Sequence, residues 1–531
     1  MNAENPAPVT AVEAADHRND EVEVLVVGAG PTGLMLANWL VKLGVRVAII
    51  DGKDGPTVES RALGVQSRSM EIYDQLGVSD LVLGQVVRAE SMRQGFGPVA
   101  FAPVPLTDLG RGITPYPGMY ILEQSANERI LADNLQALGG SVRWRHRLVE
   151  LHRSESAVRA VVESADGPRT ISARFAVGCD GASSAVRSLS GIPFEGTTSR
   201  QTFYLVDAVG VRGLAPASVN IRQGTAEFLL AFPMKPDDAG RSGQRLIGVA
   251  SDDDVAAVTE EFARYRLAEA FGVTYEDYRW FSTYRLHYRI AARFRAGPIF
   301  LAGDAAHVHS PVGAQGMNTG LQDAHNLAFK LADVVAGRTS PASLDRYSAE
   351  RRPVALHLLR TTDRLFRGVV SRSPVVTVVR RFAPRVALPI GVAVLPHLPI
   401  GRRLAGYLGQ IRIRYPMEEY ARRRRRHPVV GRRLPWTGAN FGVLRSAEWQ
   451  VHVYAADVGR IHEADAVARH LGLALHEFTT TGRTALKPGI LYLVRPDGFV
   501  AAASLPEDAV DRFAASAGVA FPKDHQKGRR E

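Results

Sequence analysis

The segment LAGDAAHVHSPVGAQGMNTG, residues 301–320, combines residue types that can bind a polar ligand. An apolar stretch ends at the carboxylate of Asp304, and the residues beyond the glycines repeat apolar side chains at helical spacing. A carboxylate after a strand can accept a hydrogen bond from a sugar-type hydroxyl. The start of the predicted helix, near Gly316, Met317 and Asn318, offers N–H groups and a dipole that favour negative charge.

A second pattern, near the N-terminus, predicts a phosphate site. The segment VEVLVVGAGPTGLMLANWLVKLGVRVAIID (22–51) predicts strand, helix and strand, the βαβ unit of a buried parallel sheet. Gly28, Gly30 and Gly33 have the G-x-G-x-x-G spacing, which serves the turn, the approach of a pyrophosphate and helix–strand packing in that order. Asp51 ends the second strand, where an acid binds ribose hydroxyls and repels a 2′-phosphate. The unit therefore predicts FAD or NAD rather than NADP.

The two segments together separate FAD from NAD. FAD carries a polyol, whose hydroxyls would bind Asp304, and a ring edge that becomes anionic on reduction and would face the helix start. Gly313, Gly316 and Gly320 would keep side chains away from the flat ring. Taken alone, the segment 301–320 is explained equally well as a surface loop before an amphipathic helix. The pair favours FAD.

Length and composition limit the class of protein. At 531 residues the chain is too long for one ordinary core, so two or three domains are expected. Residues 1–20 have neither an apolar run nor a basic start, and we expect a disordered tail with no signal peptide. The single cysteine, Cys179, excludes a disulfide framework and a cysteine-clustered metal site, and it fits a cytoplasmic protein.

The charge pattern does not require a macromolecular partner. The net charge is +11, and the densest basic run is ARRRRRH at 421–427. No aromatic residues interleave with this run, so a solvated face is favoured over a nucleic-acid site. The most apolar window, 386–401, is interrupted by three prolines and is too short to span a bilayer. We expect neither nucleic acid nor membrane among the partners.

Three motifs together resemble one enzyme family. They are VVGAGPTGL (26–34) with Asp51, VGCDGASSAVR (177–187) and GPIFLAGDAAHVHSPVGAQGMNTGLQDAHNLAFKLA (297–332). The chain resembles the class A (single-component) FAD-dependent aromatic hydroxylases, the group that includes phenol hydroxylase and hydroxylases of polyketide aromatics. Weaker similarity extends from residue 22 to residue 504.

The resemblance implies further cofactor-binding residues. Arg61 matches the family arginine near the FAD phosphates, and Gln124 matches its FAD-contacting glutamine. Asp180 would help to hold FAD and the transient nicotinamide cofactor, while Arg187 would serve the same region or pair with a neighbour. Three of these residues also have an explanation without a role in binding. Arg61 could be a surface arginine, Gln124 a polar residue at a helix start, and Asp180 a turn aspartate before glycine.

No metal site and no catalytic acid or base follow from the sequence. His307 and His309 lack a nearby carboxylate or cysteine cluster, so we expect loop histidines without a catalytic role. Any His, Tyr or Arg of the middle region could activate a phenol.

The remaining segments complete an α/β (mixed α+β) fold. Residues 201–289 predict a mostly antiparallel sheet that would form the substrate wall. Its large side chains suggest a flat hydrophobic substrate, although each is better explained as core: Phe203, Tyr204, Phe228, Phe232 and Met234. The C-terminal pattern is similar to a thioredoxin-like domain found in part of the family, here without cysteines and therefore without dithiol chemistry.

The expected domain organisation places the substrate sheet as an insertion within a Rossmann-like FAD-binding domain. The C-terminal domain would be structural, and a homodimer is one arrangement that it allows. The expected bounds are 1–20 for the tail, 21–200 and 290–365 for the FAD-binding domain, 201–289 for the substrate domain, 366–410 for a helical connector and 411–531 for the thioredoxin-like domain.

The resemblance implies a monooxygenase. NADPH or NADH would reduce FAD, O₂ would add at flavin C4a, and the hydroperoxide would hydroxylate a hydrophobic aromatic, polyketide-type substrate. Baeyer–Villiger oxidation or epoxidation on the same scaffold stays open, whereas a halogenase is disfavoured because no W-x-W-x-x-P stretch is present. A nicotinamide-dependent dehydrogenase would leave the Asp304 segment unexplained. A nucleic-acid-binding protein would rest on the arginine run alone.

Overall fold

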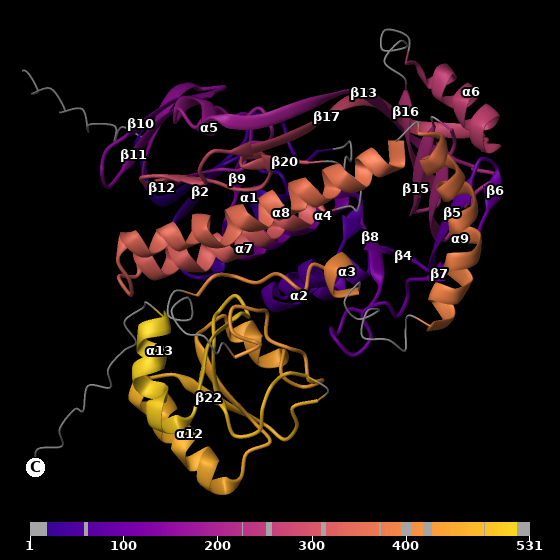
Figure 1. The fold of residues 1–531 in the computed structure, drawn as a ribbon. Coiled ribbons are helices and arrows are strands. Elements are labelled where there is room, and N and C mark those ends of the chain that lie inside the picture. The colour runs from indigo at the N-terminus through magenta and orange to yellow at the C-terminus, as the bar shows by residue number, and fades with distance from the viewer. Residues whose placement is uncertain are drawn as a thin grey trace, which may run out of the picture.

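The computed structural model has the mixed α/β fold that the sequence predicts, with three principal sheets and helices packed against them (Figure 1). The structure describes residues 19–57, 62–225, 227–250, 258–309, 315–370, 373–394, 405–417, 427–482 and 484–517.

The N-terminal sheet is built around a parallel core. Its described strands run in the order β10-β11-β12-β1-β2-β9, with β19 beside β12 and β18 beside β19. β1 pairs in parallel with β12 and β2, and its residues Val24, Leu25 and Val26 are fully buried, as expected for the central strand of a parallel sheet. The bounds are β1 (Asn19–Val27), β2 (Val47–Ile50), β9 (Val142–Arg143), β10 (Arg147–Arg153), β11 (Val158–Ser164), β12 (Gly167–Gly178), β18 (Arg295–Ala296) and β19 (Ile299–Leu301).

Two helices far apart in sequence lie side by side on this sheet. α1 begins at Pro31, where the missing proline N–H costs no helical hydrogen bond, and it packs along α7 (Figure 1). The predicted apolar stripe of α7 is fully buried, for example at Leu321 and Leu327. The helices of this region are α1 (Pro31–Lys42), α2 (Ser67–Leu76), α3 (Ser79–Leu83), α4 (Gln124–Ala137), α5 (Ala185–Leu189), α7 (Gly316–Val335) and α8 (Asp345–Val370). A small sheet of β3 (Gly64–Val65), β8 (Met119–Ile121) and β4 (Val87–Ala89) lies next to them.

The middle sheet is mostly antiparallel, as predicted, and successive side chains along its strands point to opposite faces. Its order is β20-β17-β13-β16-β15-β14-β5-β6, with β7 beside β5. Phe203, Leu205 and Phe232 belong to one apolar cluster, whereas Tyr204 and Val206 face the other way and pack with α6 (Glu260–Phe271). The bounds are β5 (Ser91–Phe96), β6 (Val99–Ala100), β7 (Val104–Pro105), β13 (Phe194–Val209), β14 (Ser218–Gln223), β15 (Phe228–Met234), β16 (Gly243–Ala250), β17 (Asp277–Ala291) and β20 (His307–Val308).

The middle sheet is larger than the sequence suggests. β5, β6 and β7 come from residues 91–105, a stretch that the sequence assigns to the FAD-binding domain, and β5 pairs in parallel with β14. These strands are short and carry no clear alternation, so only the long-range pairing defines them. In addition, β13 already begins at Phe194 and β17 extends to Ala291.

The C-terminal sheet has the order β22-β21-β23-β24, with β21 and β22 parallel and the other neighbours antiparallel. Its elements lie at the predicted segments, and this strand order supports the thioredoxin-like assignment, which stays a prediction. The unit lies below α7 and α2 in the view of Figure 1. Its elements are β21 (Gln450–Tyr454), α12 (Val458–Leu471), β22 (Ala474–Phe478), β23 (Leu491–Val494), β24 (Val500–Ser504) and α13 (Ala509–Ala517).

A helix, α9 (Pro374–Val394), lies between the FAD-binding part and the C-terminal domain in sequence, within the predicted connector. Across the described ranges, no helix combines the length and apolarity that crossing a membrane requires. Residues 421–426 of the arginine run, the N-terminal residues 1–18 and the prolines at 396 and 399 lie outside the described residues.

Candidate active site

One cavity of about 1030 Å³ joins two motifs to the middle sheet. They are the glycine loop at 26–34, called the first motif below, and the Asp304 segment at 297–332, called the second motif. Its lining includes residues of the glycine loop, of the Asp304 segment and of strands β13, β15, β16 and β17. Eight of the residues predicted to bind the cofactor line it: Gly28, Gly30, Asp51, Gln124, Asp180, Asp304, Gly316 and Met317. Its volume is at the upper end of the usual range for ligand pockets, as an elongated ligand requires.

The three glycines of the first motif have three different surroundings. A Cβ at Gly28 would lie 2.4 Å from the Cys179 carbonyl oxygen, and its φ of +102° also excludes ordinary side chains. A Cβ at Gly33 would lie 1.9 Å from the Gly28 carbonyl oxygen. A Cβ at Gly30 would meet nothing within 4 Å. Gly28 and Gly33 are therefore required by the fold itself, whereas Gly30 keeps an open space in the cavity wall.

The acid after β2 holds the glycine loop. Asp51 accepts hydrogen bonds from the N–H groups of Ala29 (2.7 Å) and Lys53 (2.9 Å). Lys53 Nζ lies 3.8 Å from Asp51 and 3.7 Å from the fully buried carboxylate of Glu128. Glu128 also accepts a hydrogen bond of 2.8 Å from the amide of Gln124, one turn earlier on α4. Asp51 and Gln124 are thus fixed before any ligand arrives.

Thr32 joins the first motif to the second. It lies in the first turn of α1 and lines the cavity. A Cβ at Gly303 would lie 2.5 Å from Thr32 Oγ1, and a Cβ at Gly320 would lie 2.3 Å from the same atom. Gly320 is therefore needed for the contact between α7 and α1, and the expectation that it keeps space for a flat ring is wrong. Gly313 lies outside the described residues.

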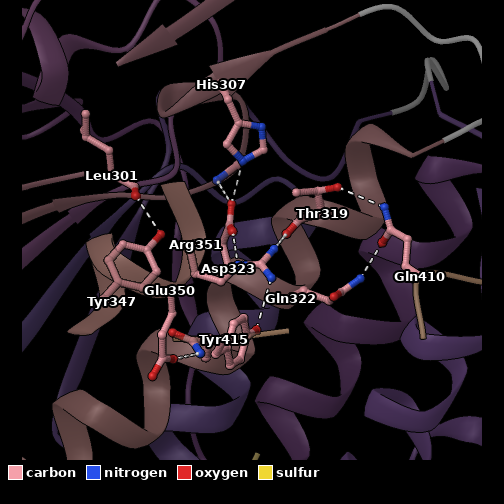
Figure 2. Close-up of polar contacts among 12 residues, drawn as sticks. Leu301, His307, Thr319, Gln322, Asp323, Tyr347, Glu350, Arg351, Gln410 and Tyr415 are labelled. Atoms are coloured by element: carbon pink, nitrogen blue, oxygen red, sulfur yellow. Dashed lines mark hydrogen bonds and ion pairs between the residues drawn. The ribbon is translucent and has the colours of Figure 1, made fainter. Parts of the chain in front are cut away.

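The Asp304 turn is anchored from behind by buried charges (Figure 2). Asp304 belongs to a short 3-10 turn, Gly303–Ala305, and the N–H of Gly303 donates to Asp323 of α7 at 3.1 Å. Asp323 also pairs with His307 (2.8 Å) and with Arg351 of α8 (2.6 Å). Burial alone would raise the pKa of Asp323, but Arg351 and His307 outweigh that effect and lower it.

This network corrects one expectation about the histidines. His307 is not a loop histidine, because it lies in β20 and is 1% exposed. Its imidazole contacts Asp323 rather than the cavity, whereas His309 lines the cavity. In the parts of the chain that the structure describes, no group of His, Cys, Asp and Glu could hold a metal ion.

Only two of the three residues predicted at the start of α7 line the cavity. Gly316 and Met317 line it. Asn318 does not: its side chain is fully buried, accepts hydrogen bonds from Gln66 N–H and Ser69 Oγ, and donates to the Gly64 carbonyl. The Asn318 side chain thus fastens α7 to α2 and β3. The prediction that the N–H groups at this helix start face the cofactor stays a prediction.

The segment VGCDGASSAVR (177–187), called the D-G motif below for Asp180 and Gly181, borders the cavity next to β12. Asp180 lines the cavity and also accepts hydrogen bonds from Ser184 Oγ and from the Val186 N–H at 3.1 Å. Burial raises the pKa of Asp180, and these hydrogen bonds oppose the effect. Arg187 donates to the carbonyls of Ala182 (2.7 Å) and Ala305 (2.9 Å), so it ties the D-G motif to the Asp304 turn.

Sequence reasoning missed Thr32, Lys53, Glu128 and Asp323. Only Glu128 carried a signal, because it lies four residues after Gln124 on the predicted helix. Arg61 lies outside the described residues. Cys179 lines the cavity, but burial first and the neighbouring Asp180 and Asp323 second raise its thiol pKa well above 9.0, so it stays protonated and inert.

Comparison with known proteins decides the family. Residues 21–362 match the family model described as FAD binding domain. The chain belongs to this family. A 12-dehydrotetracycline 5-monooxygenase/anhydrotetracycline 6-monooxygenase of Streptomyces rimosus is 32% identical over 508 residues, which cover 92% of this chain and 96% of that protein. A rifampicin monooxygenase of Streptomyces venezuelae is 35% identical over 78% of this chain and 82% of its own.

The solved structures agree. An anhydrotetracycline hydroxylase from Streptomyces rimosus superimposes with a TM-score of 0.74 at 30% identity, over 95% of this chain and 100% of that one. An aklavinone-11 hydroxylase in complex with FAD and aklavinone shares the fold, with a TM-score of 0.75 at 23% identity over 94% and 99% of the two chains. The chain is a class A FAD-dependent monooxygenase, and FAD is its cofactor.

The cavity fits this cofactor. The open wall at Gly30 leaves the backbone accessible to a pyrophosphate, and the continuous lining from Asp51 to Met317 suits a long dinucleotide.

The end of the cavity at the middle sheet, called the substrate end below, is largely apolar and contains a buried ion pair; Arg285 and His287 of β17 also line it. Phe232, Ile247, Trp280 and Tyr284 line it from the middle sheet. Arg245, fully buried, donates from Nε and Nη2 to the two oxygens of Asp207, each at 2.6 Å. Its Nη1 is buried and makes no hydrogen bond to any described residue.

Proposed function

We propose that this monooxygenase uses NADPH or NADH and O₂ to hydroxylate a hydrophobic aromatic substrate of polyketide type. The observation that carries the proposal is the single cavity, which leads from the glycine loop past the start of α7 to the apolar face of the middle sheet. Tetracycline-type and rifampicin substrates in the names of the relatives support the polyketide class.

The cofactor-binding residues of the proposal follow the cavity. Gly28 and Gly33 shape the loop, and Gly30 lets the pyrophosphate approach at the N-terminus of α1. Asp51 accepts from the ribose hydroxyls through lone pairs that Ala29 and Lys53 do not use.

The other half of the cofactor lies along the second motif in this proposal. Asp304 accepts from the ribityl hydroxyls, and the backbone at Gly316 and Met317 faces the ring edge that becomes negative. Gln124 and Asp180 contact the middle of the cofactor, and Arg61 stays a proposed phosphate contact on the resemblance alone. Asn318 holds the helix start in place rather than contacting FAD.

FAD, when bound, transfers electrons from NAD(P)H to O₂ and one oxygen atom to the substrate. The protein contributes position and environment. The first turn of α7 supplies a positive dipole end where negative charge develops, and the apolar wall keeps water away from the reacting ring.

The substrate wall favours an aromatic molecule that carries oxygen. Trp280 and Phe232 offer flat apolar surface, and Arg245 adds a guanidinium with one donor that no described residue uses. Burying an ion pair in an apolar wall costs desolvation energy that the pair only partly recovers. A keto or phenol oxygen of the substrate is a partner that would use the free donor.

Product mass with labelled oxygen tests the proposed function. The purified holoenzyme is mixed with NADPH or NADH and a panel of aromatic polyketides and simple phenols under ¹⁸O₂, and consumption of both co-substrates is followed. We expect substrate-dependent consumption and a product with one ¹⁸O atom on the aromatic ring. A product that has lost two hydrogens without gaining oxygen would contradict the proposal. One added oxygen in a ring ester or an epoxide would replace hydroxylation by Baeyer–Villiger oxidation or epoxidation.

A homodimer and a cytoplasmic location are separate proposals. The first rests on the resemblance, and the second on the single, buried Cys179. Sedimentation equilibrium of the holoenzyme tests the first: a single species of monomer mass at micromolar concentration would remove it.

A further inference from the structure

The C-terminal domain contacts α7 and α8 on the side away from the cavity. Tyr415 of this domain and Gln410, the last residue of the predicted connector, reach the helices that carry the second motif (Figure 2). We propose that Gln410 and Tyr415 are positioning residues for the cofactor, which hold the Asp304 turn and the start of α7 in the geometry that binds FAD. The inference rests on the proposed FAD site and gives the C-terminal domain a task within its own chain.

The first connection runs through three buried side chains. Arg351 donates from Nη1 to the hydroxyl of Tyr415 at 3.1 Å and from Nε to Asp323 at 2.6 Å. Asp323 accepts the N–H of Gly303, the residue before Asp304. Arg351 also donates to the Thr319 carbonyl in the first turns of α7 (3.1 Å). A displacement of Tyr415 therefore reaches both cavity-facing parts of the second motif through one guanidinium.

The guanidinium is firmly held. Arg351 and Asp323 are both fully buried. Burial alone would lower the pKa of Arg351, but Tyr415 and Asp323 outweigh it and raise the pKa. Burial raises the pKa of Tyr415, so its hydroxyl stays neutral and can accept from Arg351. Because a buried charge without its partners is costly, the arrangement has few alternatives.

The second connection is a strained glutamine. Gln410 has φ of +54°, in the left-handed region that a non-glycine residue occupies at a cost of about 1 kcal/mol. Its side chain donates to Thr319 Oγ1 at 3.1 Å and accepts from the amide of Gln322. Thr319 Oγ1 in turn donates to the carbonyl of Gln315 (2.9 Å), the residue just before α7. The strain therefore occurs where the chain must present an amide to the start of α7.

The C-terminal domain fixes Tyr415 in place. The ring of Tyr415 stacks on Phe499 with centroids 4.1 Å apart, and its N–H donates to the Gly431 carbonyl (2.7 Å). Arg495 lies over the same ring and pairs with Glu350 of α8 at 2.7 Å. The stacking on Phe499 and the hydrogen bond to Gly431 thus fix the ring of Tyr415 against the C-terminal domain.

Removal of one hydroxyl tests the first connection. In Tyr415→Phe the ring still stacks on Phe499, but Arg351 loses an acceptor. We expect FAD to bind the apoprotein about threefold to tenfold more weakly, as measured by quenching of flavin fluorescence. The matched control is Tyr454→Phe, which removes a buried hydroxyl bonded only within the C-terminal domain, to Asn440 and His452 among the described residues. FAD affinity should not change in this control, even where the melting temperature of the apoprotein falls equally.

A second variant separates positioning from general stability. Gln410→Gly relieves about 1 kcal/mol of left-handed strain, which offsets part of the loss of its two buried hydrogen bonds, so the melting temperature of the apoprotein should fall only slightly. FAD affinity should nevertheless fall by about threefold or more. Gln410→Asn, which keeps an amide on a shorter side chain, should recover less than half of the loss. Unchanged FAD affinity in Gln410→Gly would overturn the second connection.

A double mutant distinguishes failure of the inference from failure of the proposed site. Asp304→Ala alone should weaken FAD binding, and Tyr415→Phe should add little in that background because both act on the same turn. If Asp304→Ala leaves FAD affinity unchanged, the proposed site is wrong. If Asp304→Ala weakens binding but Tyr415→Phe does not, or if the two effects add fully, the positioning role is overturned while the site stands.

Discussion

The two ends of the cavity are built in opposite ways. At the cofactor end the backbone makes close approaches at Gly28, Gly33 and Gly303, and carboxylates such as Asp51 and Asp323 bind the loops from behind. At the substrate end a largely apolar sheet face carries the buried ion pair of Arg245 with Asp207. The cofactor end is thus specified by fixed polar geometry, and the substrate end largely by shape. This difference suits an enzyme whose cofactor is constant and whose substrate distinguishes it from its relatives.

The largest effect should come from the open glycine at the cofactor end. Gly30 has an ordinary backbone conformation and space for a Cβ, so Gly30→Ala should leave the apoprotein as stable as the wild type. The added methyl group should block the pyrophosphate and weaken FAD binding by about 100-fold, or about 2.7 kcal/mol. Fluorescence titration of apoprotein with FAD measures the loss.

The matched control for that variant is Gly33→Ala, whose Cβ would collide with the Gly28 carbonyl. It should lower the melting temperature of the apoprotein itself. If Gly30→Ala behaved like Gly33→Ala, or bound FAD normally, the distinction between fold glycines and a cofactor glycine would fail.

A smaller effect is expected at Asp304. Asp304→Ala should weaken FAD binding by about tenfold, because one charge-assisted hydrogen bond is lost at an accessible position. Asp304→Asn keeps an acceptor oxygen and should lose less. Dialysis followed by absorbance of the bound flavin gives the measurement. Full retention of the yellow colour in Asp304→Ala would count against the assigned role.

The substrate end should respond without any change at the cofactor end. Replacing both partners, Arg245→Met with Asp207→Leu, avoids leaving one buried charge alone and should leave stability unchanged or higher. We expect the same FAD affinity and a KM about tenfold higher for an oxygen-bearing aromatic substrate. Steady-state NAD(P)H consumption measures the KM. An unchanged KM would mean that Arg245 does not contact the substrate.

The smallest effect is expected from the titration of Glu350, a buried carboxylate of α8. Burial alone would raise the pKa of Glu350, but Arg495 and Lys330 outweigh it and lower it well below its ordinary value of 4.5. The unfolded chain therefore takes up this proton first as the pH falls, so the stabilisation is complete above pH 4.5 and is lost below it.

Glu350→Gln removes this titration. Between neutral pH and about pH 4, its melting temperature should fall less than that of the wild type, by the equivalent of about 0.8 kcal/mol. The exposed Glu163 provides the control, since Glu163→Gln should follow the wild-type curve. Parallel curves for all three proteins would contradict the assignment.

The sequence predicted the cofactor end well because its signals are local. Glycine spacing, the strand and helix around it and the acid at Asp51 all lie within one βαβ unit. The second motif was found by the same logic, a strand end followed by a helix start. The buried contacts of the Asn318 side chain could not be predicted, because a helix start has several faces and only the packing of α2 shows which one the side chain takes.

The substrate end resisted prediction because it depends on distant pairings. Asp207 and Arg245 become neighbours only when β13 pairs with β16. The short strands β5 to β7 carry no pattern of their own, and the contact of Tyr415 with Arg351 joins two domains. No local spacing of residues predicts such contacts. The strand-like segments of residues 201–289, by contrast, are local features, and they correctly predicted a mostly antiparallel sheet.

The structure of the FAD complex tests the central claim most directly, since one elongated molecule must contact both motifs. We expect density for the diphosphate beside Gly30, the adenosine ribose at Asp51, the ribityl chain at Asp304 and the ring edge at the first turn of α7. Density that reached only one motif, or two separate molecules in the two halves of the cavity, would contradict it.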